Sequence, residues 1–205
     1  MSENNKIHPT AIIESGVILG EGTSVWDNVH IRRNTQIGRH CIIGGKSLIA
    51  YEVRIGDFVK INSNVYVCYG VTLENGVMVG AGVIFTNDRF PRATNPELNG
   101  LRDSDLDEHT LKTRVCEGAS IGAGAIIGCN LTIGRFAMVG MGTVVTRDVK
   151  PFHLVVGSPG RTIGIVCRCG PPVGRVGEME LPSEMECREC GRRYHVDEEL
   201  NVREC

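Results

Sequence analysis

The sequence predicts an all-β protein in which short strands wind into stacked, three-sided coils. Two observations support this prediction: an aliphatic residue recurs at every sixth position, and the chain is rich in glycine but poor in aromatic residues. It has 26 glycines in 205 residues and only 5% aromatic residues, although 41% of its residues are hydrophobic. Because each glycine inside a helix costs about 0.5–1 kcal/mol relative to alanine, a helical core is disfavoured.

The six-residue period begins at Ile7 and runs unbroken to Phe85. It resumes in the same phase at Val115 and continues to Val145, which gives 20 hexapeptides in all. An α-helix repeats near 3.6 residues and a strand near 2, so neither alone produces this period. A chain that turns a corner every six residues does. Three corners close a triangular coil, and the stacked coils pair in parallel around an aliphatic core.

The same repeat also predicts where the corners lie. In most hexapeptides, glycine or asparagine occupies the position three residues after the aliphatic one, and both residue types tolerate a positive φ. We therefore expect tight corners at these residues: Gly16, Gly22, Asn28, Asn34, Asn64, Gly70, Gly76, Gly82, Gly118, Gly124, Asn130 and Gly142.

The rhythm stops over residues 86–114, where the sequence TNDRFPRATNPELNGLRDSDLDEHTLKTR collects prolines and charges. Because the phase is restored afterwards, this segment is predicted to leave the prism as a loop and to return to the adjacent position. Loops of this length are uncommon in compact domains and are usually functional. The alternative is a tolerated surface insertion.

Composition argues against nucleic acid and membranes as partners. The formal net charge is −2, with 22 Lys and Arg against 24 Asp and Glu, so the chain lacks the basic field of a nucleic-acid-binding protein. No run approaches the roughly 18 apolar residues that span a membrane. The N-terminal run MSENNKIHPT lacks the apolar segment of a secretory signal, so we expect a cytoplasmic protein.

The C-terminal residues 165–205 are predicted to form a small module separate from the main domain, residues 1–164. Their cysteines, Cys167, Cys169, Cys187 and Cys190, form two pairs of the kind found in structural four-cysteine Zn²⁺ ribbons. The first pair, C-x-C, is tighter than the usual C-x2-C, which leaves His195 or Cys205 open as a substitute ligand. A redox pair or free thiols are the alternative.

Two runs in the main domain resemble a known family. VTLENGVMVGAGVIFTNDRFPRA, Val71 to Ala93, and VGMGTVVTRDVKPFHLVVGSPGRTIG, Val139 to Gly164, are similar to the hexapeptide-repeat acyltransferases, which fold as left-handed parallel β-helices. They look like the subgroup that acetylates the 3-amino group of a sugar linked to UDP or dTDP. UDP-2-acetamido-3-amino-2,3-dideoxyglucuronate N-acetyltransferases and dTDP-3-amino-3,6-dideoxyhexose N-acetyltransferases belong to it. The resemblance covers residues 7–166. It implies a homotrimer, an acetyl-CoA cosubstrate, and a role in surface polysaccharide synthesis such as that of O-antigen and lipopolysaccharide.

The resemblance also implies roles for residues near the interruption. Asn87 matches the asparagine that contacts the sugar amino group. An amide orients the amine rather than acting as a strong base, so Asp88, the departing thiolate or solvent takes the proton. Glu74 and Asn64 match polar positions around the acceptor, and Arg92 is placed to meet a carboxylate or phosphate. Simple polarity of the corners is the alternative for these three residues.

Histidine bases and coenzyme contacts complete the expected site. Some related enzymes use a histidine base, for which His30 and His109 are the candidates, although no spacing selects either one. Small residues that match the coenzyme region, where the ligand approaches the backbone, are Gly122, Ala123, Gly140 and Gly142. Cations that match its phosphate end are Arg147, Lys150 and Arg161.

Two other functions are open to this fold. A zinc carbonic anhydrase needs three converging histidines, but His30 and His40 lie ten residues apart and the later coils have none. A non-catalytic trimeric scaffold, whose zinc tail recruits partners, would bind no coenzyme A. The resemblance therefore favours an acetyl-CoA-dependent N-acetyltransferase over these two alternatives.

Overall fold

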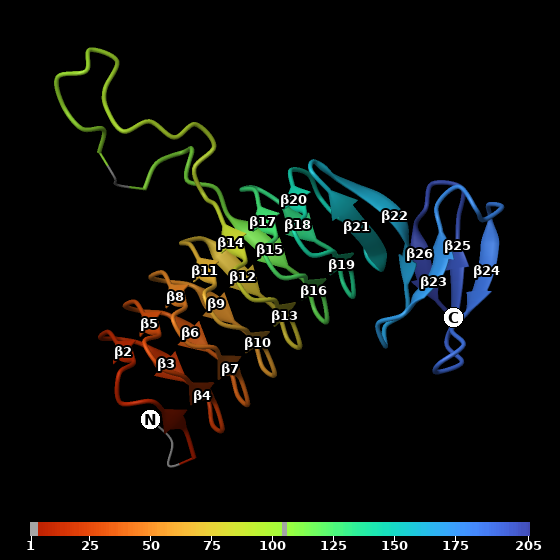
Figure 1. Cartoon of the computed structure of the whole chain (residues 1–205), viewed down its shortest axis with the longest axis horizontal. Helices are drawn as coiled ribbons and strands as arrows, with labels where there is room; N and C mark the ends of the chain where they lie inside the picture. Colours follow the sequence, from red (N-terminus) through yellow and green to blue (C-terminus); the bar gives the residue numbers. More distant parts are fainter. Residues whose placement is uncertain (1–3, 104–105) are drawn as a thin grey trace.

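The computed structural model describes residues 4–103 and 106–205 of the chain. These residues form strands and turns but no helix, and the strands stack into a three-sided prism with a small module at its C-terminal end (Figure 1). The all-β fold predicted from the sequence is confirmed. Residues 104–105 of the predicted loop lie outside the described residues. No helix that could span a membrane occurs in the part of the chain that the structure describes.

The prism has three faces, here called sheets A, B and C. Sheet A contains β1 (Lys6–Ile7), β4 (Ser24–Val25), β7 (Ile42–Ile43), β10 (Lys60–Ile61), β13 (Met78–Val79), β16 (Ser120–Ile121) and β19 (Met138–Val139). Sheet B contains β2 (Ile12–Ile13), β5 (His30–Ile31), β8 (Leu48–Ile49), β11 (Tyr66–Val67), β14 (Ile84–Phe85), β17 (Ile126–Ile127) and β20 (Val144–Val145). Sheet C contains β3 (Ile18–Leu19), β6 (Gln36–Ile37), β9 (Arg54–Ile55), β12 (Val71–Leu73), β15 (Thr113–Val115) and β18 (Thr132–Ile133).

Strands of successive coils pair in parallel and in a constant register. Lys60 pairs with Met78 on sheet A, and Arg54 pairs with Thr72 on sheet C. The loop does not disturb this register, because Ile84 before it pairs with Ile126 after it. The loop therefore leaves the stack and returns to the next position, as the restored phase predicts.

The sixth-position aliphatic residues form the core. Each is the last residue of its short strand, and every one from Leu19 to Val145 is buried. Burial of each such side chain contributes about 1.5–3 kcal/mol to folding. Most buried hydroxyl groups are satisfied by backbone; for example, Thr23 Oγ1 donates to the Gly38 carbonyl at 2.8 Å, whereas Thr143 Oγ1 has no partner among the described residues. The core is therefore a single aliphatic column in which the hydroxyl groups other than that of Thr143 are paired.

The corners predicted at glycine and asparagine are confirmed, since all of them have positive φ. The same corner position also holds residues that do not favour this conformation, among them His40 and Phe58 at φ 55° and 59°. A left-handed residue of this kind costs about 1–2 kcal/mol. The pairing of coils above and below fixes the corner, so it outweighs the preference of the individual residue.

Beyond Val145 the prism continues for one more coil, which the period does not predict. Val149 and Val155 are buried there, but they are out of phase with the repeat. β21 (His153–Gly157) pairs in parallel with β19, and β22 (Gly160–Val166) and β23 (Pro172–Arg175) then extend sheet A in antiparallel fashion. β22 thus runs across the boundary expected between residues 164 and 165.

The C-terminal module (residues 165–205) ends in a small antiparallel sheet. It consists of β24 (Ser183–Glu186), β25 (Arg193–Val196) and β26 (Val202–Glu204), with β25 in the middle. In Figure 1 the module lies beyond β21 and β22, at the end of the prism opposite the N-terminus. The division into two domains stays a prediction.

Candidate functional site

The extruded loop leaves at the corner between sheets B and C, here called corner BC, and its two ends are tied together. The Leu111 amide donates to the Asn87 carbonyl at 2.8 Å, and Asp88 forms an isolated antiparallel bridge with Thr110. Asn87 is half-buried, and among the described residues its side-chain amide makes no hydrogen bond. The fold therefore fixes the backbone of Asn87 and leaves its amide available to a ligand.

A polar hollow of about 330 Å³ opens beside Asn87. The hollow is lined by Asn87, Asp88 and Arg92 together with Arg102 and other loop residues, so three of the predicted site residues meet there. Asp88 Oδ1 accepts the Phe90 amide at 2.8 Å, and Arg92 Nη1 donates to a neighbouring carbonyl. Arg102 is neutralised by an ion pair, 2.9 Å long, with a loop carboxylate. Arg92 is therefore the hollow's cation without a carboxylate partner among the described residues.

An aromatic and cationic stack adjoins this hollow, and the sequence reasoning missed it. Tyr51 lines the hollow, its ring lies 5.2 Å from that of Tyr69, and the Arg33 guanidinium lies 4.8 Å from its centroid. These residues occupy one ladder of corner BC, because Arg33, Tyr51, Tyr69 and Asn87 are each 18 residues apart. The 18-residue length of a coil was the signal that could have found them.

The predicted coenzyme residues lie at the opposite edge of sheet B, here called corner AB. Gly122 and Gly140 pack directly against the next coil; a Cβ on Gly122 would lie 2.5 Å from the Met141 nitrogen. A Cβ on Gly142 would meet only open space. Asn64 and Ala123 belong to the same corner, where an open hollow of about 540 Å³ is lined by small residues of earlier coils, such as Gly44 and Gly45, together with larger ones, such as Trp26 and Lys60. Corner AB is thus a strip in which small residues alternate with a few large exposed side chains.

Two other predicted substrate residues are already engaged within the prism. Glu74 forms an ion pair with Arg114, and its other oxygen accepts the Glu117 amide at 2.9 Å. It lies at the corner between sheets C and A. His30 faces outward from sheet B, and its Nε2 lies 2.7 Å from Glu14 Oε1. Hydrogen bonding to the Arg33 amide and to His30 lowers the pKa of Glu14. Within one chain, neither residue meets Asn87.

The predicted phosphate-binding cations are divided between solvent and the C-terminal module. Arg147 is exposed, and Arg161 Nη1 donates to the Gly160 carbonyl. Lys150 Nζ donates to the Glu199 carbonyl at 2.7 Å and to Asn201 Oδ1 at 3.0 Å. Lys150 therefore binds the module. His109, the other candidate base, packs edge-on against Phe90 in the loop.

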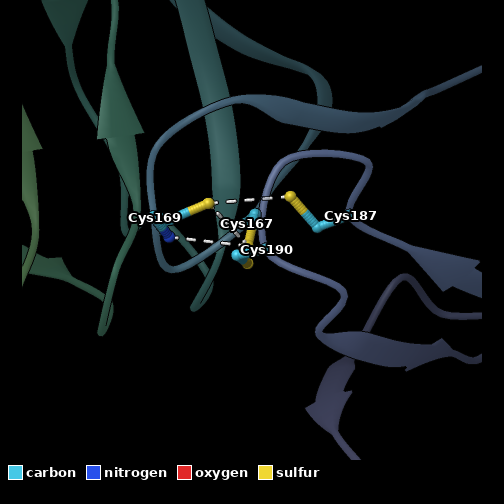
Figure 2. A group of neighbouring side chains, drawn as sticks. All are labelled: Cys167, Cys169, Cys187 and Cys190. Carbon is cyan, nitrogen blue, oxygen red and sulfur yellow. Dashed lines mark hydrogen bonds between the residues drawn. The ribbon is translucent and has the colours of Figure 1, made fainter.

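The four cysteines of the module face one another from two loops (Figure 2). Their Sγ atoms all lie within 4.8 Å of one another, and all are free thiols. His195 and Cys205 lie outside this cluster, since His195 Nδ1 is 2.7 Å from a carboxylate oxygen of Glu184. The structure thus brings together the four sulfurs named from the sequence.

The outward side chains of the three sheets differ in character. On sheet B they are mostly apolar, and several are substantially exposed: Ile12 at 58%, Tyr66 at 39%, Ile84 at 43% and Ile126 at 40%. On sheet C the corresponding residues are mostly polar or charged, including Gln36, Arg54, Thr72, Arg114 and Thr132. Sheet B, which lies between corners AB and BC, is therefore the apolar face of the prism.

Comparison with known proteins matches the repeats. Residues 17–50 and 52–87 match the family model of the bacterial transferase hexapeptide (six repeats), so the matched region ends at Asn87. A dTDP-3-amino-3,6-dideoxy-alpha-D-galactopyranose 3-N-acetyltransferase of Aneurinibacillus thermoaerophilus is 40% identical over 83 residues, which are 40% of this chain and 40% of that protein. A serine acetyltransferase of Escherichia coli (strain K12) is 35% identical over 97 residues, 46% of this chain and 34% of that protein.

A solved structure is similar over most of the fold. AntD, an N-acyltransferase from Bacillus cereus in complex with dTDP and 3-hydroxybutyryl-CoA, superposes with a TM-score of 0.55 over 82% of each chain, at 17% identity. At this identity the likeness concerns the fold alone. The chain spans 40% of the length of the first curated relative and 34% of that of the second.

Proposed function

Because the chain belongs to the bacterial transferase hexapeptide-repeat family, we propose that it is an acyl-CoA-dependent N-acetyltransferase acting on the amino group of a nucleotide-linked sugar. The observation that carries this proposal is Asn87, whose backbone is fixed at the base of the loop and whose amide is free beside a polar hollow. The relative that acetylates a dTDP-linked 3-amino sugar supports the 3-amino group as the acceptor.

Transfer of an acetyl group to an amine requires a neutral, oriented nitrogen and an acceptor for its proton. The side-chain oxygen of Asn87, Oδ1, accepts a hydrogen bond from the substrate amine. This hydrogen bond directs the lone pair of the amine nitrogen at the thioester carbon. The C–N bond forms, the C–S bond breaks, and coenzyme A departs as the thiolate. The proton reaches the thiolate directly or through Asp88, whose Oδ2 carries no hydrogen bond among the described residues. Arg92 binds a substrate carboxylate or phosphate.

The acyl-CoA cosubstrate is assigned to corner AB. A pantetheine arm needs close access to backbone amides, and Gly142 and the exposed Ala123 leave that access open, while Gly122 and Gly140 pack against the next coil beside them. Arg147 and Arg161 are the cations proposed for the phosphates, since the ammonium of Lys150 is held by the module. His30 with its Glu14 partner is a second candidate for proton transfer.

The two halves of this site lie at opposite edges of sheet B, so the proposal includes a homotrimer. Burial of an exposed apolar face against a second copy is favourable, and a head-to-tail contact that closes forms a ring. Such a contact sets corner AB of one subunit beside corner BC of the next. The acceptor site at Asn87 and the donor site at Gly142 then meet across the interface.

The remaining features of the proposal follow from its substrates and cysteines. Acyl-CoA and nucleotide-linked sugars are cytoplasmic metabolites, and acetylated amino sugars are building blocks of surface polysaccharides such as lipopolysaccharide and its O-antigen. The proposal therefore includes that the protein acts in the cytoplasm, at the step that acetylates the amino sugar. One structural Zn²⁺ ion is assigned to the four clustered cysteines.

Thiol release tests the proposal directly. The protein is incubated with acetyl-CoA and a panel of UDP- and dTDP-linked 3-amino and 4-amino sugars, and free coenzyme A is measured together with the mass of the product. Turnover is expected with a 3-amino sugar and not with the matched 3-hydroxy sugar. Absence of turnover with every acceptor, together with absence of acetyl-CoA binding, would refute the proposal and favour a non-catalytic scaffold.

A further inference from the structure

The four clustered cysteines have the geometry of a metal site. The Sγ atom of Cys167 lies 3.3 Å from that of Cys169 and 3.4 Å from that of Cys190, and Cys169 lies 3.6 Å from Cys187. Four sulfurs bound to zinc at about 2.3 Å in a tetrahedron lie about 3.8 Å apart. These three separations lie within about 0.5 Å of that value, and no pair of the four sulfurs is more than 4.8 Å apart, so the set is close to the arrangement that holds one ion.

Each cysteine pair sits on a turn that a glycine closes, and the sulfurs of the two turns face one another. In the first, the Gly170 amide donates to the Cys167 carbonyl at 2.8 Å, and in the second the Gly191 amide donates to the Cys187 carbonyl at 2.8 Å. Each glycine has a positive φ, 116° and 71° respectively, which glycine adopts without strain. The first turn spans three residues, from 167 to 170, and the second spans four, from 187 to 191. The two turns differ in length, yet they bring the four sulfurs within 4.8 Å of one another, so no substitute ligand is needed.

The module also lacks a core that would fold it without a metal. Its fully buried cluster comprises Ile165, Cys167, Cys187, Tyr194 and Val196, packed on Phe152 of the prism, and two of its own five residues are cysteines of the site. A unit of about 40 residues rarely folds on so small a core without a disulfide or metal. An all-sulfur tetrahedral site suits zinc or iron. Because the proposed acyl transfer moves no electrons, zinc is the metal that fits.

A continuous path of contacts joins the cysteine cluster to the prism. The Tyr194 hydroxyl lies 3.1 Å from Cys167 Sγ and accepts the Arg168 amide at 2.9 Å, so its own proton is free for the sulfur. The Tyr194 ring is fully buried and lies 5.4 Å from that of Phe152, which lies 5.5 Å from that of Phe136. Phe136 belongs to the corner of the coil that precedes the last one.

Polar contacts fasten the module at a second point. His153 Nε2 donates to the Leu200 carbonyl at 2.8 Å. Lys150 Nζ donates to the carbonyl of Glu199 and to the side-chain oxygen of Asn201, the residues before and after Leu200. The turn that offers these acceptors is itself held by Asp197, which accepts the amides of Glu199 and Asn201. Both donors belong to the last coil of the prism.

The end of a β-helix requires cover, because its last strand edge and its core would otherwise face water. We infer that the four cysteines bind one zinc ion, and that the zinc-bound module is the C-terminal cap that keeps the last coil (residues 146–157) folded. Loss of the ion unfolds the module, removes the Tyr194 and His153 contacts, and exposes the edge of β22 that pairs with β23. The adjacent coil carries Gly140 and Gly142, so cap loss also loosens corner AB.

Metal analysis and hydrogen exchange test this inference on the full-length chain. Protein purified in reductant without chelator is expected to contain about one zinc per chain and no visible iron–thiolate absorption. Removal of zinc with a chelator is expected to raise amide exchange in the module and the last coil. Residues 6–79 stay protected, and added zinc reverses the change. Iron in the site, no metal, or exchange that rises in the module alone would overturn the inference.

Two variants on β25 separate the metal site from mere packing. Tyr194→Phe keeps the ring but removes the hydroxyl group beside Cys167. Loss of a hydrogen-bond partner of a metal ligand typically weakens metal binding by about 10–100-fold, so the zinc Kd of this variant is expected to rise at least tenfold. His195→Gln, the neighbouring residue outside the cluster, is expected to leave the zinc Kd unchanged. Equal zinc affinity in the Tyr194 variant and the wild type would contradict the path described above. These readouts do not depend on turnover, so their failure leaves the proposed acyl transfer standing.

Discussion

Phe85 is the last core residue before the loop, and its truncation tests the hexapeptide phase. It is the only aromatic residue among the sixth-position residues, its side chain is fully buried, and it lies two residues before Asn87. Phe85→Ala removes the ring from a column whose coils are held in register above and below, so collapse into the space is limited. Truncations of this kind cost about 3–5 kcal/mol.

The assay is thermal and urea denaturation of Phe85→Ala beside a matched control. In a chain of this size each kcal/mol lowers Tm by about 2–4 °C, so a fall of at least 6 °C or so is expected. Phe90→Ala is the control, because Phe90 lies in the extruded loop and is 58% exposed. Its effect is expected to stay within about 0.5 kcal/mol. Equal losses in the two variants would refute the inward placement of Phe85 and with it the assigned phase.

Three further predictions concern the cap, the coenzyme corner and the assembly. Burial lowers the pKa of His153, so the unfolded chain binds a proton before the folded chain does as the pH falls below about 6.5. The Tm is therefore expected to fall with decreasing pH in that range. His153→Gln keeps a donor to the Leu200 carbonyl and should make the Tm depend less on pH. Ala123→Leu fills the strip at corner AB and is expected to raise KM for acetyl-CoA at least tenfold without lowering Tm, whereas an unchanged KM would place the coenzyme elsewhere. Ile126→Lys on sheet B is expected to convert trimers to monomers, as measured by light scattering. The control is Ile18→Lys on sheet C, which is expected to leave the trimer intact although Ile18 is 59% exposed in this chain. The reverse pattern would contradict sheet B as the interface.

The core of the fold could be predicted because its period is redundant. Every coil repeats the same inward positions, so one irregular hexapeptide does not shift the others. The last coil could not be predicted in this way, because Val149 and Val155 lie out of phase with the repeat after Val145. Burial there is set by β21 and by the module that covers it, which are features of tertiary structure.

Corner residues show a second limit of sequence reasoning. Gly and Asn mark many corners correctly, but His40 and Phe58 occupy the same corner position against their own conformational preference. Their rings stack with a centroid separation of 5.4 Å, so contacts between successive coils help to hold the corner. A rule based on single residues cannot see this contact, whereas reading the sequence in steps of 18 residues can.

The candidate site was only partly accessible from the sequence. Asn87, Asp88 and Arg92 are close in sequence and share one hollow, so the break in the repeat located them. Tyr51 lies far from these residues in sequence and lines the same hollow only because successive coils stack. Lys150, which looked available by its charge alone, is bonded to the module.

The central claim is that Asn87 holds the acceptor amine for acyl transfer. It is tested most directly by kcat/KM for the best amino-sugar acceptor, compared between wild type, Asn87→Ala and the loop control Glu97→Ala. Asn87→Ala is expected to lose about 100-fold, or about 2.7 kcal/mol of transition-state stabilisation, at unchanged Tm. Glu97→Ala, an exposed position in the same loop, is expected to match wild type. Wild-type kcat/KM in the Asn87→Ala protein would contradict the account.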